Sequence, residues 1–166
     1  MGCSDPMPLV FLGLGSNIGD AAATLRSAFA ELSALLGGAR MSRLHASRAM
    51  YDEDQPDFVN AAASGITQLP PMELLDAVHR IEARFGRERD ARRPKGPRTL
   101  DIDILLYGDL VLKDAGLTIP HASMHERRFV LEPLLELSPD LSDPESGERY
   151  SSMLKKLPPQ GIYLLE

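Results

Sequence analysis

The most constraining stretch of the chain runs from Leu100 to Tyr107, where aspartates and aliphatic residues alternate. Successive side chains of a β-strand point to opposite faces, so Asp101 and Asp103 should share one face with Leu105 and Tyr107. The other face would then consist of the aliphatic residues Leu100, Ile102, Ile104 and Leu106. The pattern therefore predicts a strand with one aliphatic face and one face that carries two carboxylates.

These two carboxylates form a candidate metal site. Residues i and i+2 of a strand lie about 7 Å apart at the backbone, so Asp101 and Asp103 can converge on one or two hard cations. Ligands that are all oxygen favour Mg²⁺ over Zn²⁺, and protein-bound Mg²⁺ in turn favours phosphate. Taken alone, an Asp-x-Asp pair is more often an ordinary solvated strand face. The prediction of a metal site therefore depends on what surrounds the pair.

A basic segment directly precedes the strand. Residues 84–98 contain seven Lys or Arg and two acidic residues, a local charge of +5, whereas the remaining residues carry 11 basic and 22 acidic side chains. A concentrated cationic segment on an acidic protein suits a small anionic ligand better than a polyanion. The combination predicts phosphate chemistry and argues against general binding of nucleic acid.

Length and composition predict one soluble domain. At 166 residues and 43% hydrophobic, the chain can bury a core of its own, and we expect a single domain over 1–166 with a frayed N-terminus at 1–8. The single cysteine, Cys3, excludes a disulfide framework and suits a reducing compartment. No apolar run reaches the length of a membrane span, and the first residues lack a signal-peptide core. We expect a cytoplasmic monomer without a membrane partner.

The order of elements predicts an α+β fold. Strands are expected near 9–14, 40–47, 58–67, 100–107 and 162–165, and helices near 21–36, 72–85, 124–137 and 151–157. Pro133 should kink or restart the third helix. The order strand, helix, two strands, helix, strand fits a ferredoxin-like βαββαβ core. We expect a mostly antiparallel sheet with helices packed on it, in three αβα layers.

The glycines at positions 13, 15 and 19 resemble a dinucleotide-binding fingerprint. Their last member lies one position too far along, and no acidic residue occurs between positions 32 and 51 to bind a ribose. A simpler interpretation is a tight turn in which Ser16, Asn17 or Asp20 caps the following helix. An oxidoreductase built on this turn remains an alternative.

Several motifs together resemble the signature of the 6-hydroxymethyl-7,8-dihydropterin pyrophosphokinases of folate biosynthesis. The longest is GPRTLDIDIL at 96–105. The others are GLGSN at 13–17, DQPDFVNAA at 54–62, RIE at 80–82, LTIPH at 117–121 and MHERRFVLEPL at 124–134. They are long, occur in order and extend over nearly the whole chain.

The resemblance implies a reaction and its partners. Diphosphate would pass from ATP to the hydroxymethyl group of the dihydropterin, with release of AMP. Two Mg²⁺ ions would lie between the triphosphate and the positions of Asp101 and Asp103. The partners would be ATP and the pterin, with no nucleic acid. No residue is an obvious general base, and Asp101 is the candidate for orienting the hydroxymethyl group.

The same resemblance assigns site residues. The pterin would contact Ser47, Met50, Phe58, Asn60, Asp101 and Phe129. ATP would contact His79, Glu82, Arg87, Arg89, Arg98, Ile104, Thr118, His121 and Arg127. Arg87 and Arg98 would neutralise the transferring β-phosphate, and with the aspartate pair they are the predicted catalytic residues. Without the resemblance, Phe58 would be interpreted as core and Asn60 as a turn residue.

The chain departs from common versions of the family in its loops. Residues 47–51 are SRAMY where many members have TPPLG, and Pro94-Lys95 replaces a frequent tryptophan. Smaller changes occur at His79, Gly116 and Ala122. None of them affects the aspartate pair.

A non-catalytic alternative uses the same segments differently. A ferredoxin-like module could bind RNA through the basic segment 84–98. Such modules interleave aromatic side chains with basic ones, and only Phe85 lies near this segment. The pyrophosphokinase is therefore the leading hypothesis.

Overall fold

The computed structural model describes residues 7–48, 56–86 and 99–165. Its strands are β1 (Leu9–Ser16), β2 (Gly37–Met41), β3 (His45–Ser47), β4 (Phe58–Ile66), β5 (Asp101–Tyr107), β6 (Leu112–Lys113), β7 (Thr118–Ile119) and β8 (Ile162–Leu164). Its helices are α1 (Ala21–Ser33), α2 (Pro71–Arg84), the 3₁₀ turn η1 (Met124–Glu126), α3 (Arg128–Leu137) and α4 (Tyr150–Lys156).

The main sheet has the strand order β5-β1-β4-β3-β8, and β2 also pairs with β4. All of these pairs are antiparallel. The predicted strand at 40–47 is split into β2 and β3 because Ser42 interrupts it. The hydroxyl of Ser42 accepts the N–H of Ala62 at 2.9 Å, in place of a regular ladder bond. With β2 and β3 counted as one strand, the ferredoxin-like βαββαβ prediction is confirmed.

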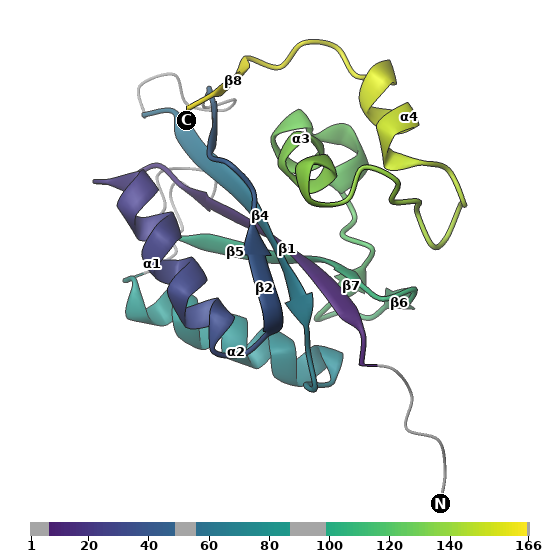
Figure 1. Ribbon diagram of the computed structural model, residues 1–166, viewed down its shortest axis with the longest axis horizontal. Coiled ribbons are helices and arrows are strands. Elements are labelled where there is room, and N and C mark those ends of the chain that lie inside the picture. Colours follow the sequence, from purple (N-terminus) through teal and green to yellow (C-terminus); the bar gives the residue numbers. More distant parts are fainter. Residues whose placement is uncertain (1–6, 49–55, 87–98, 166) are drawn as a thin grey trace, which may run out of the picture.

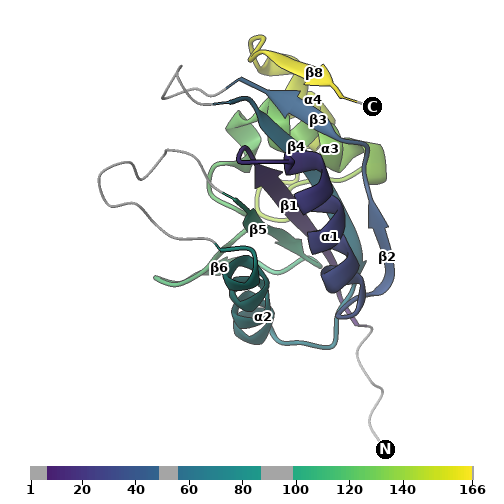
Figure 2. The ribbon, with the colours of Figure 1, turned by 90° about the vertical axis from the view of Figure 1, so that its left-hand side faces the viewer.

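Helices cover both faces of the sheet (Figure 1). The face toward α1 and α2 buries one aliphatic cluster, with Leu25 and Leu32 of α1 against Leu74 and Val78 of α2. The opposite face buries a second cluster, in which Leu131 and Leu134 of α3 pack with Tyr150 of α4. Figure 2 shows α1 and α2 in front of the sheet and α3 behind it. The three-layer αβα arrangement is therefore confirmed. No described helix is long and apolar enough to span a bilayer.

The glycine-rich N-terminal stretch is not a dinucleotide-binding turn. Gly13 and Gly15 lie inside β1, which pairs antiparallel with strands on both of its sides. Of the three glycines only Gly19, with φ +65°, occupies the turn, and Asp20 caps α1 by accepting the N–H of Ala23 at 3.1 Å. A dinucleotide fingerprint needs its glycines in a turn after a parallel strand. The oxidoreductase interpretation is therefore wrong, and the capping interpretation is confirmed at Asp20.

Strand β5 departs from simple alternation at its far end. The register with β1 shifts between Phe11 and Leu12, so Phe11 pairs with Leu106 and Leu12 pairs with Ile104. Leu105 and Leu106 both join the cluster under α3, and Tyr107 packs on the opposite cluster. A bulge adds one residue to a strand and reverses the faces that follow. The predicted faces of Leu106 and Tyr107 are therefore wrong, whereas those of the aspartates hold.

Two predicted helix bounds also differ from the structure. The break in the third helix falls at Arg127, between η1 and α3, while Pro133 lies inside α3 and does not restart it. Pro133 has no N–H, so α3 loses one hydrogen bond, the one to the carbonyl four residues earlier in its first turn. Helix α1 ends at Ser33, because the chain then enters β2 at Gly37.

Pro8, the last residue of the N-terminus that we expected to be frayed, is fixed in place, because its carbonyl accepts the N–H of Thr67 at 3.1 Å.

Candidate active site

Asp101 lies in a row of three residues that crosses the sheet. Asp101 of β5 pairs with Gly15 of β1, and Gly15 pairs on its other side with Asn60 of β4. Directly opposed residues of antiparallel strands share a face, so the three lie side by side on the face that also carries α3. Neighbouring strands are about 4.8 Å apart, which places the backbones of Asp101 and Asn60 about 10 Å from each other.

Glycines keep the middle of this row open. A Cβ atom on Gly15 would lie 3.2 Å from Oδ1 of Asn60, and one on Gly13 would lie 3.5 Å from the Leu105 side chain. Gly13 pairs with Asp103 as Gly15 pairs with Asp101. The sheet floor between the carboxylates and Asn60 therefore carries no side chain from β1; the Leu105 side chain covers Gly13, and Oδ1 of Asn60 lies over Gly15.

Asn60 is held in a fixed orientation at one end of the floor. Its Nδ2 donates to Oγ of Ser47 at 2.8 Å, and both residues are buried. Phe58 lies two residues before Asn60 on β4 and pairs with Ser47 of β3. With its amide nitrogen engaged by Ser47, Asn60 presents Oδ1 above Gly15. The structure thus brings together Ser47, Phe58 and Asn60, as the resemblance implied.

A cavity of about 280 Å³ lies at the carboxylate end. Its walls come from α2, β5 and the segment after β6, and its residues include His79, Glu82, Asp101, Asp103, Ile104, Thr118 and His121. Predicted metal ligands and predicted nucleotide contacts thus line one cavity. Gly116 and Ala122, two of the positions at which the chain departs from the expected motifs, also line it.

Glu82 connects α2 to the carboxylate strand. It is only 3% exposed, and its Oε2 accepts the N–H of Ile102 at 2.8 Å. Ile102 lies between the two aspartates, and its own side chain is buried on the opposite face. Glu82 is therefore not a solvated residue on the helix surface, because the helix turns it inward to the strand backbone.

His121 approaches Asp103 from the segment after β7. Its backbone N–H donates to the carbonyl of Leu105 at 3.0 Å, which fixes it beside β5. Its Nδ1 accepts the N–H of Ser123 at 3.3 Å, and its Nε2 lies 3.9 Å from Oδ1 of Asp103. A neutral imidazole that accepts at Nδ1 carries its proton on Nε2, the atom that faces the carboxylate.

Arg127 and Phe129 lie at the start of α3. The Arg127 guanidinium is 5.6 Å from the centre of the Phe129 ring, a cation–π distance. Helix α3 packs on β4 and β3, the strands that carry Asn60 and Ser47. The start of α3 therefore brings a cation and an aromatic ring to the face of the sheet that carries Asn60.

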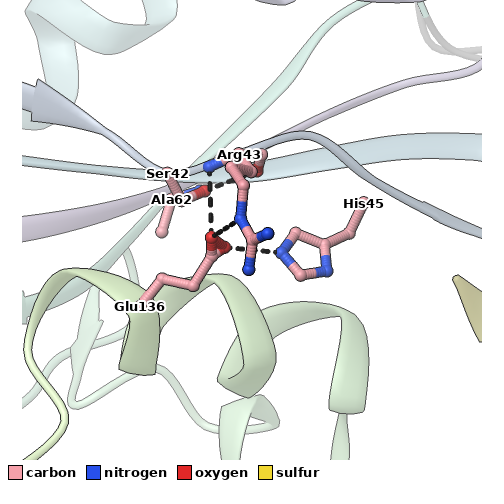
Figure 3. A network of polar contacts seen from close by, with 5 residues as sticks. All are labelled: Ser42, Arg43, His45, Ala62 and Glu136. Atoms are coloured by element: carbon pink, nitrogen blue, oxygen red, sulfur yellow. Dashed lines mark hydrogen bonds and ion pairs between the residues drawn. The ribbon is translucent and has the colours of Figure 1, made fainter. Parts of the chain in front are cut away.

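A polar network at the other end of α3 was not predicted (Figure 3). The carboxylate of Glu136 accepts Nε of Arg43 at 2.8 Å and hydrogen-bonds Nε2 of His45 at 2.8 Å. His45 is buried and pairs with Asn60 across β3 and β4. Burial raises the pKa of the Glu136 carboxyl, but hydrogen bonds from Arg43 and His45 outweigh it and hold the pKa below the ordinary value of 4.5. No local motif marks these residues, because they meet only after α3 packs on β3.

Four predicted site residues lie outside the described part of the chain. They are Met50, Arg87, Arg89 and Arg98. The described residues contain no group of three or more His, Cys, Asp or Glu arranged to hold a metal. If Mg²⁺ binds here, the aspartate pair can offer two ligand residues, and phosphate or water oxygens would have to complete its coordination.

Comparison with known proteins identifies relatives of this chain. The family model of 7,8-dihydro-6-hydroxymethylpterin-pyrophosphokinase matches residues 11–139. The 2-amino-4-hydroxy-6-hydroxymethyldihydropteridine pyrophosphokinase of Methylorubrum extorquens is 43% identical over 166 residues, which cover 96% of this chain and all of that protein. The Synechocystis protein of the same name is 43% identical over 88% of this chain and 74% of its own length.

Larger proteins contain a similar region. The folic acid synthesis protein fol1 of Schizosaccharomyces pombe is 42% identical over 94% of this chain, which spans only 21% of that protein. A crystal structure of Plasmodium falciparum HPPK-DHPS with pteroate superimposes with a TM-score of 0.71 at 14% identity, over 94% of this chain and 43% of that one. At this identity the structural likeness supports the fold alone.

Proposed function

The chain belongs to the 7,8-dihydro-6-hydroxymethylpterin-pyrophosphokinase family, and we propose that it transfers diphosphate from ATP to the hydroxymethyl group of 6-hydroxymethyl-7,8-dihydropterin. The products are AMP and the pterin diphosphate, an intermediate of tetrahydrofolate biosynthesis. The observation that carries the proposal is the row Asp101–Gly15–Asn60. It joins a carboxylate-lined cavity to a buried amide across a floor to which β1 adds no side chain.

The pterin is assigned to the Asn60 end of this floor. Phe58 and Phe129 would stack on its two faces, which contributes about 0.5–1.5 kcal/mol beyond burial. Asn60 would accept from the ring edge through Oδ1, since Ser47 already engages its Nδ2. Met50 is proposed as a further contact. The hydroxymethyl group would then point along the floor toward Asp101, which is proposed to orient it.

ATP is assigned to the cavity at the Asp103 end. Glu82, Ile104, His79 and Thr118 line it, and they are proposed to bind the nucleoside. His121 and Arg127 are proposed to bind the triphosphate. Arg87, Arg89 and Arg98 complete the proposed contacts, with Arg87 and Arg98 directed to the β-phosphate. Positive charge around a transferring phosphoryl group stabilises its transition state.

The residues present fit a Mg²⁺ requirement. Asp101 and Asp103 offer adjacent carboxylates on one strand face, and the residues opposite them on β1 are Gly15 and Gly13, which add no side chains of their own. We propose that they hold two Mg²⁺ ions together with ATP. When bound, such ions neutralise phosphate charge and lower the pKa of a bound hydroxyl group. The strand supplies rigid placement, because Glu82 holds its backbone between the two ligands.

A product analysis tests the proposed function. Purified protein is mixed with ATP, Mg²⁺ and the dihydropterin, and nucleotides are separated by chromatography. We expect AMP to form in proportion to the pterin diphosphate and to be absent without the pterin. Formation of ADP, or no turnover, would contradict the proposal.

The expected monomeric state and cytoplasmic location belong to the same proposal. The location is supported by the single cysteine, which suits a reducing compartment. Light scattering coupled to size-exclusion chromatography tests the monomer, which should show the mass of 18.2 kDa.

A further inference from the structure

The segment from Leu157 to Leu165, here termed the C-terminal segment, runs from α4 to the edge of the main sheet (Figure 1). Its first residues are held by Arg128, at the start of α3. Nη2 of Arg128 donates to the carbonyl of Leu157 and Nε donates to the carbonyl of Pro158, both at 2.9 Å. The segment is therefore bound through its backbone to the helix that carries Phe129.

Gln160 makes a second contact with the same helix start. Its Oε1 accepts the backbone N–H of Arg128 at 2.8 Å, and its Nε2 donates to the carbonyl of Glu126 at 3.0 Å. The first N–H groups of a helix lack partners within the helix, so this amide satisfies one of them. Gln160 thus brackets Arg127 on both sides, at the junction of η1 and α3.

The other half of the segment reaches the opposite wall of the pterin site. After a turn at Gly161, where φ is +68°, Ile162 pairs with Ser47 in the β3–β8 ladder. The Tyr163 hydroxyl donates to Oδ2 of Asp57 at 2.7 Å. This hydrogen bond raises the pKa of the Tyr163 phenol. Asp57 directly precedes Phe58.

Three of these contacts fall on or next to a proposed pterin residue. Arg128 precedes Phe129, Ile162 pairs with Ser47, and Tyr163 binds the residue before Phe58. We propose that the C-terminal segment is a positioning element that sets the separation of the two walls of the pterin site, with Gln160 holding the α3 wall and Tyr163 holding the sheet wall. The proposal rests on the proposed function, because it assumes that the pterin binds between these walls.

The physical argument concerns where the two walls are anchored. Phe129 lies in the first turn of α3 and Phe58 is the first residue of β4, so both rings sit at element ends. Element ends move more readily than their centres, because fewer backbone hydrogen bonds hold them. The C-terminal segment supplies hydrogen bonds at both of these ends. Loss of those bonds should loosen the pterin site without altering the carboxylate strand.

Two substitutions test the positioning role. Gln160→Ala removes both bonds to the helix start, and Tyr163→Phe removes only one hydroxyl group. Lys156→Ala is the control, because it breaks an exposed ion pair with Glu148 just before the segment and touches neither wall. The KM values for pterin and for ATP, kcat, and the pterin Kd by calorimetry are measured for each, well below the melting temperature of each variant.

We expect Gln160→Ala to raise the pterin KM about tenfold, because two hydrogen bonds of ordinary strength are lost. Tyr163→Phe loses one such bond and should raise the pterin KM about threefold. In Tyr163→Phe the ATP KM and kcat should stay within about twofold of wild type, as should all parameters of Lys156→Ala. An unchanged pterin KM in both variants of an active enzyme would overturn the positioning role. Equal rises in pterin and ATP KM in Tyr163→Phe would also overturn it. A wild-type protein that releases no AMP would instead overturn the proposed function, and this inference with it.

Discussion

The buried carboxylate of Glu82 accepts the N–H of Ile102 at 2.8 Å, and Ile102 is the residue between Asp101 and Asp103. Helix α2 therefore holds the carboxylate strand near its start, between the two aspartates. Within the described part of the chain, β5 is the outermost strand on this side of the main sheet, so no described strand pairs with its outer edge. Glu82 takes the place of a neighbouring strand at Ile102, the residue between the two aspartates.

Glu82→Ala should lower both stability and activity. The substitution leaves the buried N–H of Ile102 without its acceptor, which costs about 1–3 kcal/mol. Glu82→Gln keeps an acceptor oxygen of the same reach and should retain more of both. Thermal unfolding and AMP release are compared for the two variants. Equal losses in both would show that the charge of Glu82, rather than its bond to Ile102, is what matters.

Asp101→Asn and Asp103→Asn should each abolish most of the activity. Both changes preserve shape but remove the charge that binds Mg²⁺, and we expect a fall in rate on the order of 10³-fold. The rate is measured over a Mg²⁺ titration, with Asp109→Asn in the turn after β5 as the matched control. Activity close to wild type in either variant would contradict the metal assignment.

Gly15→Ala should impair pterin binding selectively. The added Cβ would lie 3.2 Å from Oδ1 of Asn60, closer than an ordinary contact, and it would add a side chain to the sheet floor. The pterin KM should rise several-fold while the ATP KM changes little. Gly13→Ala is the comparison, since its Cβ would meet Leu105 at an ordinary 3.5 Å. A larger effect at Gly13 than at Gly15 would contradict the placement of the pterin beside Asn60.

Glu136→Gln should destabilise the protein at neutral pH and less so in acid. The Glu136 carboxyl is desolvated by burial, but hydrogen bonds from Arg43 and His45 hold its pKa below the ordinary 4.5. A carboxyl with a lowered folded-state pKa stabilises the fold above its unfolded pKa, and this contribution disappears as pH falls through the folded value. The difference in melting temperature between wild type and variant should therefore shrink below about pH 4.5.

Glu145→Gln serves as the control for the acid experiment, because it breaks an exposed ion pair with Lys113 at 2.8 Å. Exposed pairs contribute little to stability, so its melting temperature should follow that of wild type across the pH range. A constant difference between wild type and Glu136→Gln at all pH values would contradict the electrostatic origin of the effect.

Strand and helix periodicity predicted the core because both are local properties. The alternation in β5 places Asp101 and Asp103 on one face as expected, and the antiparallel α+β sheet is confirmed. Alternation fails only after the bulge opposite Phe11 and Leu12, where Leu106 and Tyr107 exchange faces. A bulge depends on the partner strand, so the pattern of β5 alone does not reveal it.

The sequence by itself determined the family, the order of elements and the carboxylate pair, since motifs and periodicities are read along one segment at a time. The tertiary structure alone decided that Gly15 lies between Asp101 and Asn60, that Glu82 turns inward to Ile102, and that Gln160 reaches Arg128. These relationships join residues far apart along the chain. They depend on strand register and helix packing, which are set by the burial of all elements together.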